Sequence, residues 1–185
     1  MGVAYKNFWS LNTDEVVVTG MLRQYFNHNA EVFMPINAQC KDIDLILMDM
    51  NTRKNVTLQV KGSRAFEPRA TETQKYLEGS AGWFFFKKET ILNATADYFI
   101  FLIYIIEYSN KTGRRFLVPH TITIATKKLK ELCQKYKKIV KGERYNLIFW
   151  INPKTKRVFD IKDNKLDLSE YLDNNGLEIL SRELK

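Results

Sequence analysis

The sequence predicts an α/β protein in which helices pack on a mixed β-sheet, and three observations support this fold class. Residues 12–28 carry apolar side chains at spacings of three and four, the pattern of an amphipathic helix. Three apolar segments follow at 30–37, 42–50 and 55–63, and short polar turns separate them, as expected for the strands of a meander. Further strand-like and helical segments then alternate, so strands and helices belong to one architecture.

The predicted N-terminal helix has a recognisable start. Asn12 is a suitable N-cap residue, and Asp14 and Glu15 fall in the first turn, where negative charge interacts favourably with the helix dipole. Its apolar positions are Val18, Met21, Leu22, Tyr25 and Phe26. These positions share one side of the helix, which we expect to face the sheet.

The predicted strand at 42–50 is apolar on both faces. Because side chains alternate along a strand, Leu45 and Leu47 point one way while Asp44 and Ile46 point the other. A strand of this kind belongs in the middle of a sheet that is covered on both sides.

The rest of the chain continues the alternation of elements. Residues 64–82 show no clear period and contain Pro68 and several glycines, so we expect a loop over one end of the sheet, with a helical turn at 73–77. Further strands are expected at 83–87, 98–107, 115–119, 145–152 and 157–161. Further helices are expected at 126–140 and 168–172.

Length and composition fit one folded domain. A chain of 185 residues buries about two thirds of its unfolded surface. Apolar residues make up 45% and aromatic residues 13%, which excludes an intrinsically disordered chain. We therefore expect a single domain over residues 1–185, with a core unit at 12–125 and a C-terminal extension at 126–185 that adds a basic helix and further strands.

Charge and cysteine content indicate the partner and the compartment. The net charge of +8 favours a polyanionic partner, and residues 127–144 hold eight Lys or Arg against two Glu. The two cysteines are far apart and there are only two histidines, so neither a zinc site nor a disulfide framework is indicated, and we expect a reducing, cytoplasmic setting. The longest apolar run, 98–106, is about half the length that a membrane helix needs, so no membrane partner is expected.

Polar side chains on two neighbouring strands are placed so that they can meet. Gln59 and Lys61 share one face of the predicted strand 55–63. If Asp44 lies on the same face of the neighbouring strand, a carboxylate, an amide oxygen and an ammonium group converge at one point of the sheet. A buried, unpaired charge there would cost several kcal/mol, so Asp44 and Lys61 form either a structural ion pair or part of a metal site.

The order of these residues resembles a known nuclease motif. Asp44-Leu45-Ile46, followed by Leu58-Gln59-Val60-Lys61-Gly62-Ser63, resembles the PD-(D/E)XK nuclease superfamily, in the branch where Gln replaces the second acid. Glu15 on the first helix, followed by Glu31-Val32-Phe33-Met34-Pro35, is similar to the order in group I intron homing endonucleases of that fold and in archaeal Holliday-junction resolvases. The resemblance covers residues 12–63, and beyond them only the order of helices and strands is similar.

This resemblance implies a restriction-endonuclease-like fold, a mixed central β-sheet flanked by helices, and a DNA-cleaving site. By that resemblance Asp44, Gln59 and the backbone carbonyl of Val60 hold Mg²⁺ or Mn²⁺, with Glu15 as an accessory acid. Lys61 positions or activates the attacking water and stabilises negative charge on the phosphate. Gln59 departs from the superfamily pattern, because a neutral amide binds a cation less strongly than a carboxylate does.

Two of the acidic residues have competing interpretations. Glu15 stands three residues after Asn12, where it would complete a capping box instead of contacting a metal. Asp42 shares the face of Asp44 and is either a second acid of the site or a strand-start residue near water.

Basic residues in two regions are candidates for DNA contact. They are Arg64, Arg69, Lys127, Lys128, Lys130 and Lys135. The arginines follow Lys61 closely and are better placed for the scissile region. The lysines either follow a phosphate backbone or form the solvated side of an amphipathic helix. The tryptophans Trp9, Trp83 and Trp150 fall in strand-like contexts and are predicted to lie in the core, not to stack on bases.

The sequence therefore predicts a metal-dependent endonuclease that hydrolyses phosphodiester bonds of DNA. A homodimer or higher homo-oligomer would pair two sites by symmetry, as in enzymes that cut both strands. The alternative is a catalytically inactive protein of the nuclease fold that binds nucleic acid or another partner.

Overall fold

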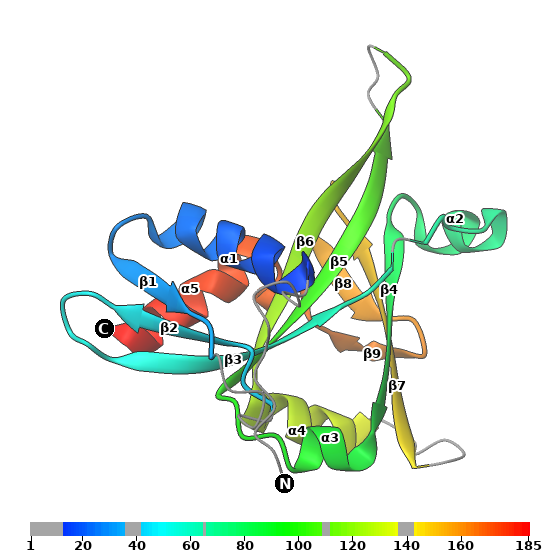
Figure 1. Cartoon of the computed structure of the whole chain (residues 1–185). Coiled ribbons are helices and arrows are strands. Elements are labelled where there is room, and N and C mark those ends of the chain that lie inside the picture. The colour runs from blue at the N-terminus through cyan, green and yellow to red at the C-terminus, as the bar shows by residue number, and fades with distance from the viewer. Residues whose placement is uncertain (1–12, 36–41, 65, 109–111, 137–142) are drawn as a thin grey trace, which may run out of the picture.

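The computed structural model describes residues 13–35, 42–64, 66–108, 112–136 and 143–185 (Figure 1). Its strands form two β-sheets, and helices pack against them. The helices are α1 (Thr13–Phe26), α2 (Ala70–Tyr76), α3 (Lys88–Leu92), α4 (Thr126–Tyr136), the 3-10 turn η2 (Ser169–Tyr171) and α5 (Asp173–Leu184). The strands are β1 (Ala30–Phe33), β2 (Leu45–Asp49), β3 (Asn55–Gly62), β4 (Ser80–Lys87), β5 (Tyr98–Tyr108), β6 (Arg115–Ala125), β7 (Arg144–Asn152), β8 (Arg157–Asp160) and β9 (Asp163–Asp167).

The first sheet has five strands in the order β1-β2-β3-β5-β6. β1, β2 and β3 form an antiparallel meander, in which Leu45 pairs with Leu58. β3 then runs parallel to β5, with Lys61 opposite Phe101, and β5 pairs with β6 in the antiparallel sense. This arrangement confirms the predicted α/β class with a mixed sheet flanked by helices.

The second sheet has four strands in the order β4-β7-β8-β9, all antiparallel. The sequence did not predict that these strands form a sheet of their own beside the mixed sheet. β4 belongs only to this second sheet and pairs along its whole length with β7, from Ser80 opposite Ile151 to Lys87 opposite Arg144. Gly82 permits β4 to lie close to the first sheet, because a Cβ there would lie 2.5 Å from the side chain of Ile103 on β5.

Two large cores give the molecule three layers, and a smaller cluster of Ala81, Ile148 and Trp150 lies on the second sheet. The larger core lies between the sheets, where Phe101 makes edge-on ring contacts with Phe84 and Phe149 at centroid distances of 4.9 and 5.2 Å. The second core lies between the other face of the five-stranded sheet and helices α1 and α5, which Figure 1 shows together on that side. In this second core Leu58 and Val60 of β3 pack with the buried residues of both helices.

Several element boundaries differ from the predictions. The helix predicted at 168–172 is wrong, because η2 occupies 169–171 and the true helix, α5, follows at 173–184. β6 continues to Ala125 instead of ending at 119, and neither α3 nor β9 was predicted. The predicted helix 126–140 is confirmed to residue 136, and its remainder lies outside the described residues. No helix in the described part of the chain is long and apolar enough to cross a membrane.

Candidate functional site

Asp44 and Lys61 lie close together on one face of the five-stranded sheet. The backbone N–H of Asp44 donates to the carbonyl of Leu58 at 2.9 Å, which extends the β2–β3 pairing and places Asp44 opposite Gln59. The ammonium Nζ of Lys61 is 3.8 Å from Oδ2 of Asp44. Their side chains are 31% and 20% exposed, so a ligand can reach both. The structure thus brings together the acid and the lysine that the sequence predicted would meet.

The backbone of Val60 is directed towards the same carboxylate. The N–H of Val60 donates to Oδ2 of Asp44 at 2.8 Å. Because the N–H and C=O of one strand residue point to the same side of the strand, the carbonyl of Val60 also faces the edge where Asp44 lies. Both contacts described for the carboxylate of Asp44 are made by Oδ2.

Gln59 is buried beside this pair. Its Nε2 donates to Oδ1 of Asp42 at 3.2 Å, and this bond fixes the direction of the amide group. Its Oε1 is buried and has no hydrogen-bond partner among the residues that the structure describes. A buried carbonyl oxygen without a donor costs about 1–3 kcal/mol, and a bound cation would offset that cost.

Asp42 lies in the turn before β2 and not within the strand. Its φ of 68° places it in the left-handed region, which Asp tolerates better than most residues. It is half-buried, and its carboxylate orients the amide of Gln59. The structure therefore gives Asp42 a supporting contact that neither interpretation of the sequence contained.

Glu15 lies on the other side of the sheet from Asp44 and Lys61. It is buried on α1, on the side of the helix that also carries Val18 and Leu22. Those residues belong to the core that includes Val60, on the face of β3 opposite Gln59 and Lys61. Within the described residues no three Asp, Glu, His or Cys side chains are gathered so that they could hold a metal, so Glu15 does not form an acidic triad with the two aspartates. The capping box with Asn12 lies outside the described residues.

The acid that touches the end of β3 is Asp14, which sequence reasoning did not single out. A Cβ on Gly62 would lie 1.8 Å from Oδ2 of Asp14, so the carboxylate packs directly on the glycine that follows Lys61. The hydroxyl of Tyr104 donates to Oδ1 of Asp14 at 3.4 Å. Burial, followed by the charge of Asp14, raises the pKa of Tyr104. The feature of the sequence that could have indicated this contact is Gly62, because a glycine in a strand leaves room for another side chain to approach the backbone.

The predicted DNA-contacting residues occupy two places. Arg64 and Arg69 are exposed, between the end of β3 and the start of α2. On α4, exposed side chains belong to Lys127, Lys128 and Lys135. Lys130 is half-buried and donates from Nζ to the carbonyl of Ala94 at 3.0 Å, so its ammonium is engaged within the protein.

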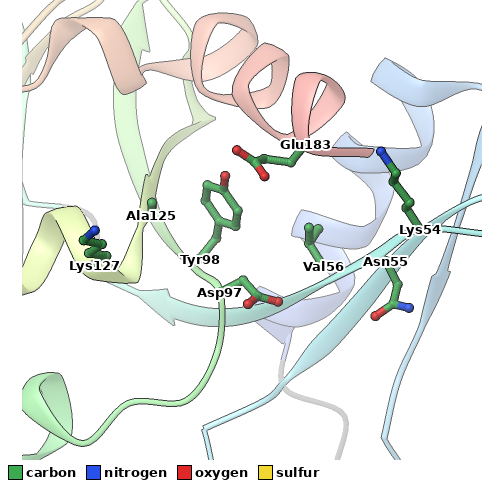
Figure 2. A pocket seen from close by; sticks show the side chains of 8 residues that line it. All are labelled: Lys54, Asn55, Val56, Asp97, Tyr98, Ala125, Lys127 and Glu183. Atoms are coloured by element: carbon green, nitrogen blue, oxygen red, sulfur yellow. The ribbon is translucent and has the colours of Figure 1, made fainter. Parts of the chain in front are cut away.

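A cavity of about 410 Å³ lies at the opposite end of β3 from Lys61, at the level of Asn55 (Figure 2). Lys54 and Lys127 line it from two sides. Tyr98 points its hydroxyl towards Glu183, and burial, followed by that negative charge, raises the pKa of Tyr98 to about 12. This cavity is separate from the candidate site, because the length of β3 lies between them.

The tryptophans differ in their surroundings. The prediction that they belong to the core is confirmed for Trp150, which is fully buried, and is wrong for Trp83, which is 38% exposed. Trp9 lies outside the described residues. A run of four aromatic residues at 83–86 hid the alternation that would have shown which face of β4 is exposed.

Comparison of the chain with protein-family models, curated proteins and solved structures finds no match. The candidate site is thus defined by its own residues and geometry.

Proposed function

We propose that this protein is a metal-dependent endonuclease that hydrolyses phosphodiester bonds of DNA. The observation that carries the proposal is the meeting of Asp44, Gln59 and Lys61 on one face of the sheet, with a buried amide oxygen that has no described donor. The mixed sheet, in which an antiparallel meander continues into a parallel neighbour, supports the restriction-endonuclease-like fold that the sequence motif implies.

The oxygen atoms at the site suit a hard divalent cation. Asp44, the Oε1 atom of Gln59 and the carbonyl of Val60 would hold Mg²⁺ or Mn²⁺, without Glu15, which lies on the other side of the sheet. Mg²⁺ retains several waters and needs only one or two carboxylates together with substrate phosphate oxygens, so this small set of ligands is sufficient. When bound, the ion would polarise the phosphoryl group and lower the pKa of a bound water.

Lys61 acts on the reacting phosphate. Its ammonium group is partly exposed, and the carboxylate of Asp44 holds it at the site. From there Lys61 donates a hydrogen bond to the attacking water and stabilises the negative charge that develops on the phosphate. Asp42 supports the site indirectly. Because Asp42 accepts the hydrogen bond from Nε2 of Gln59, the Oε1 atom of Gln59 points away from Asp42.

Charge supports DNA as the partner. The chain carries a net charge of +8, and Arg64 and Arg69 are exposed just beyond the end of β3. Phosphate contacts of this type make binding strongly salt-dependent. Such a partner fits the cytoplasmic setting expected from the cysteine content, and a symmetric homodimer would place two sites on one duplex.

The second candidate function is a catalytically inactive protein of the same fold that binds nucleic acid. The observation that favours it is the direct contact of Lys61 with Asp44, which as an ion pair would satisfy both charges without a metal. In that case DNA binding would be salt-sensitive and would survive the substitution Asp44→Ala.

The test is a cleavage assay on plasmid, linear and branched DNA with Mg²⁺ or Mn²⁺. We expect cleavage by the wild type, none in EDTA, and none by Asp44→Ala or Lys61→Ala. Lys54→Ala is the matched control, because Lys54 is exposed at the other end of β3. Absence of cleavage on every substrate, or unchanged cleavage by Lys61→Ala, would exclude the endonuclease.

A further inference from the structure

An exposed group of aromatic rings lies on one face of β4. Burial alternates along this strand, so that Phe84 and Phe86 enter the core while Trp83 and Phe85 are 38% and 55% exposed. Trp83 stacks on Phe66 with a centroid distance of 5.0 Å and an interplanar angle of 26°, and Phe85 approaches Trp83 at 6.4 Å. We call Phe66, Trp83 and Phe85 the aromatic platform. Large exposed aromatic groups of this kind mark binding surfaces.

Hydrogen bonds fix the backbone beneath the platform. The backbone N–H of Trp83 donates to Oγ of Ser63 at 2.9 Å. The hydroxyl of Ser80 donates to the carbonyl of Phe66. The stacked pair is therefore held before any ligand arrives, which reduces the entropy lost on binding.

Basic side chains flank the platform. Lys87 lies on the same face of β4 as Trp83 and Phe85, and its cross-strand partner Arg144 is also exposed. At the other side Arg64 is exposed directly after Ser63. Glu67, in the same loop as Phe66, is paired with Arg115 at 3.3 Å, so its negative charge is offset.

The platform adjoins the candidate site through Ser63. Ser63 follows Lys61 by two residues, which corresponds to about 7 Å along the chain. With the hydrogen bond that the N–H of Trp83 donates to Oγ of Ser63, the backbones of Lys61 and Trp83 are on the order of 10 Å apart, or about three base-stacking steps of 3.4 Å. A single strand whose phosphate lies at Lys61 therefore needs only about three further nucleotides to reach the platform.

We infer that the aromatic platform stacks on unpaired bases, and that the substrate of the proposed nuclease is DNA with a single-stranded segment beside the scissile bond. This inference rests on the proposed function. Bases of an intact duplex already stack on each other, whereas every unpaired base offers a flat face to an aromatic ring. Aromatic rings interleaved with Arg and Lys are the combination that binds single strands with little sequence preference.

The experiment measures binding without cleavage. A fluorescent 15-nucleotide oligo-dT and a duplex of equal length are titrated in EDTA, with fluorescence anisotropy as the signal. We expect Trp83→Leu and Phe85→Ala each to weaken single-strand binding by about tenfold and to leave duplex binding unchanged. Phe116→Ala is the matched control, because Phe116 is 45% exposed on β6 and belongs to the other sheet.

A second variant distinguishes the loss of stacking from misfolding of the protein. Trp83→Phe keeps an aromatic ring, so its affinity should stay within about threefold of the wild type, whereas quenching of tryptophan fluorescence by oligo-dT should largely disappear. Equal affinities of Trp83→Leu, Phe85→Ala and wild type for oligo-dT would overturn the inference and leave a protein partner as the occupant of this face. Equal losses on oligo-dT and duplex would overturn it as well.

The binding and cleavage experiments together test the platform inference and the endonuclease proposal independently. If no DNA is cleaved under any condition but oligo-dT binding depends on Trp83 and Phe85, the endonuclease proposal fails and the platform stands. If Lys61-dependent cleavage occurs and the platform variants cut tailed and blunt duplexes like the wild type, the platform fails and the endonuclease stands.

Discussion

The substitution Gly62→Ala tests the junction between α1 and the end of β3. A Cβ at this position would lie 1.8 Å from Oδ2 and 2.2 Å from Cγ of Asp14. Ordinary contact between such atoms begins near 3.5 Å, so the carboxyl group would have to move by roughly 2 Å. That movement would also break its hydrogen bond with the hydroxyl of Tyr104.

The expected loss of stability follows from two opposing terms. Overpacking costs about 1–3 kcal/mol, and the lower part of this range applies because the side chain of Asp14 is only half-buried and can rotate. Replacing Gly by Ala also restricts the unfolded chain, which contributes about 0.4–1 kcal/mol of stability. We therefore expect Gly62→Ala to lose about 1 kcal/mol, or about 2–4 °C in Tm for a chain of this size.

A double-mutant cycle isolates the contact. In the background Asp14→Ala the clash is absent, so Gly62→Ala should be neutral or stabilising by up to about 1 kcal/mol, which gives a coupling energy of about 1–2 kcal/mol. Urea unfolding followed by circular dichroism measures all four proteins. If the two substitutions are additive and Gly62→Ala is as stable as the wild type, the carboxylate of Asp14 does not lie against Gly62.

Three further predictions concern stability. The pKa of Tyr98 is raised to about 12, above its value of about 10 in an unfolded chain, so stability should fall as the pH rises from 10 to 12, and Tyr98→Phe should remove this slope in urea unfolding. Asp173→Ala should cost about 1–3 kcal/mol, because Nδ1 of His120 and the N–H of Thr121 lose the carboxylate that contacts them at 2.8 and 2.9 Å; an unchanged urea midpoint would refute those contacts. Gly176→Ala should cost about 2 kcal/mol or more, because the new Cβ would lie 2.3 Å from the backbone oxygen of Tyr171. Gly20 is an exposed residue of α1 with nothing within 4 Å of a new Cβ, so Gly20→Ala should add up to about 1 kcal/mol; thermal unfolding of both variants distinguishes packing from helix propensity.

Local patterns were sufficient to locate the candidate site. The period of two along β3 placed Gln59 and Lys61 on one face, and the short turn between β2 and β3 fixed which neighbouring residues they meet. The contact of Asp44 with Lys61 follows from those two features alone. The bond between Asp42 and Gln59 could not be predicted, because it depends on a left-handed residue in the turn before β2.

The pairing of strands that are far apart in the chain could not be predicted from the sequence. The partner of β4 is β7, about sixty positions further along the chain, and apolar periodicity contains no information on which of several strands pair. The exposure of Trp83 depends on this pairing, since the opposite face of β4 fills the core between the sheets. α5 was missed because Asn174-Asn175-Gly176 resembles a turn, whereas Gly176 is needed for close packing against Tyr171.

Gln59 decides how firmly the proposed cation is held. In Gln59→Glu a carboxylate would face those of Asp42 and Asp44, so without a divalent ion the variant should be less stable than the wild type. With Mg²⁺ or Mn²⁺ the added charge should strengthen binding, and the increase in Tm on adding metal should exceed that of the wild type. An equal or smaller increase would indicate that no cation binds beside Gln59.

The central claim is tested most directly by the initial rate of DNA cleavage as a function of Mn²⁺ concentration, measured for the wild type, Lys61→Ala and the control Lys54→Ala. The proposal predicts metal-dependent cleavage by the wild type and Lys54→Ala, and a rate lower by about 100-fold or more for Lys61→Ala at saturating metal. A rate that does not depend on metal, or that is equal in Lys61→Ala and wild type, would contradict it.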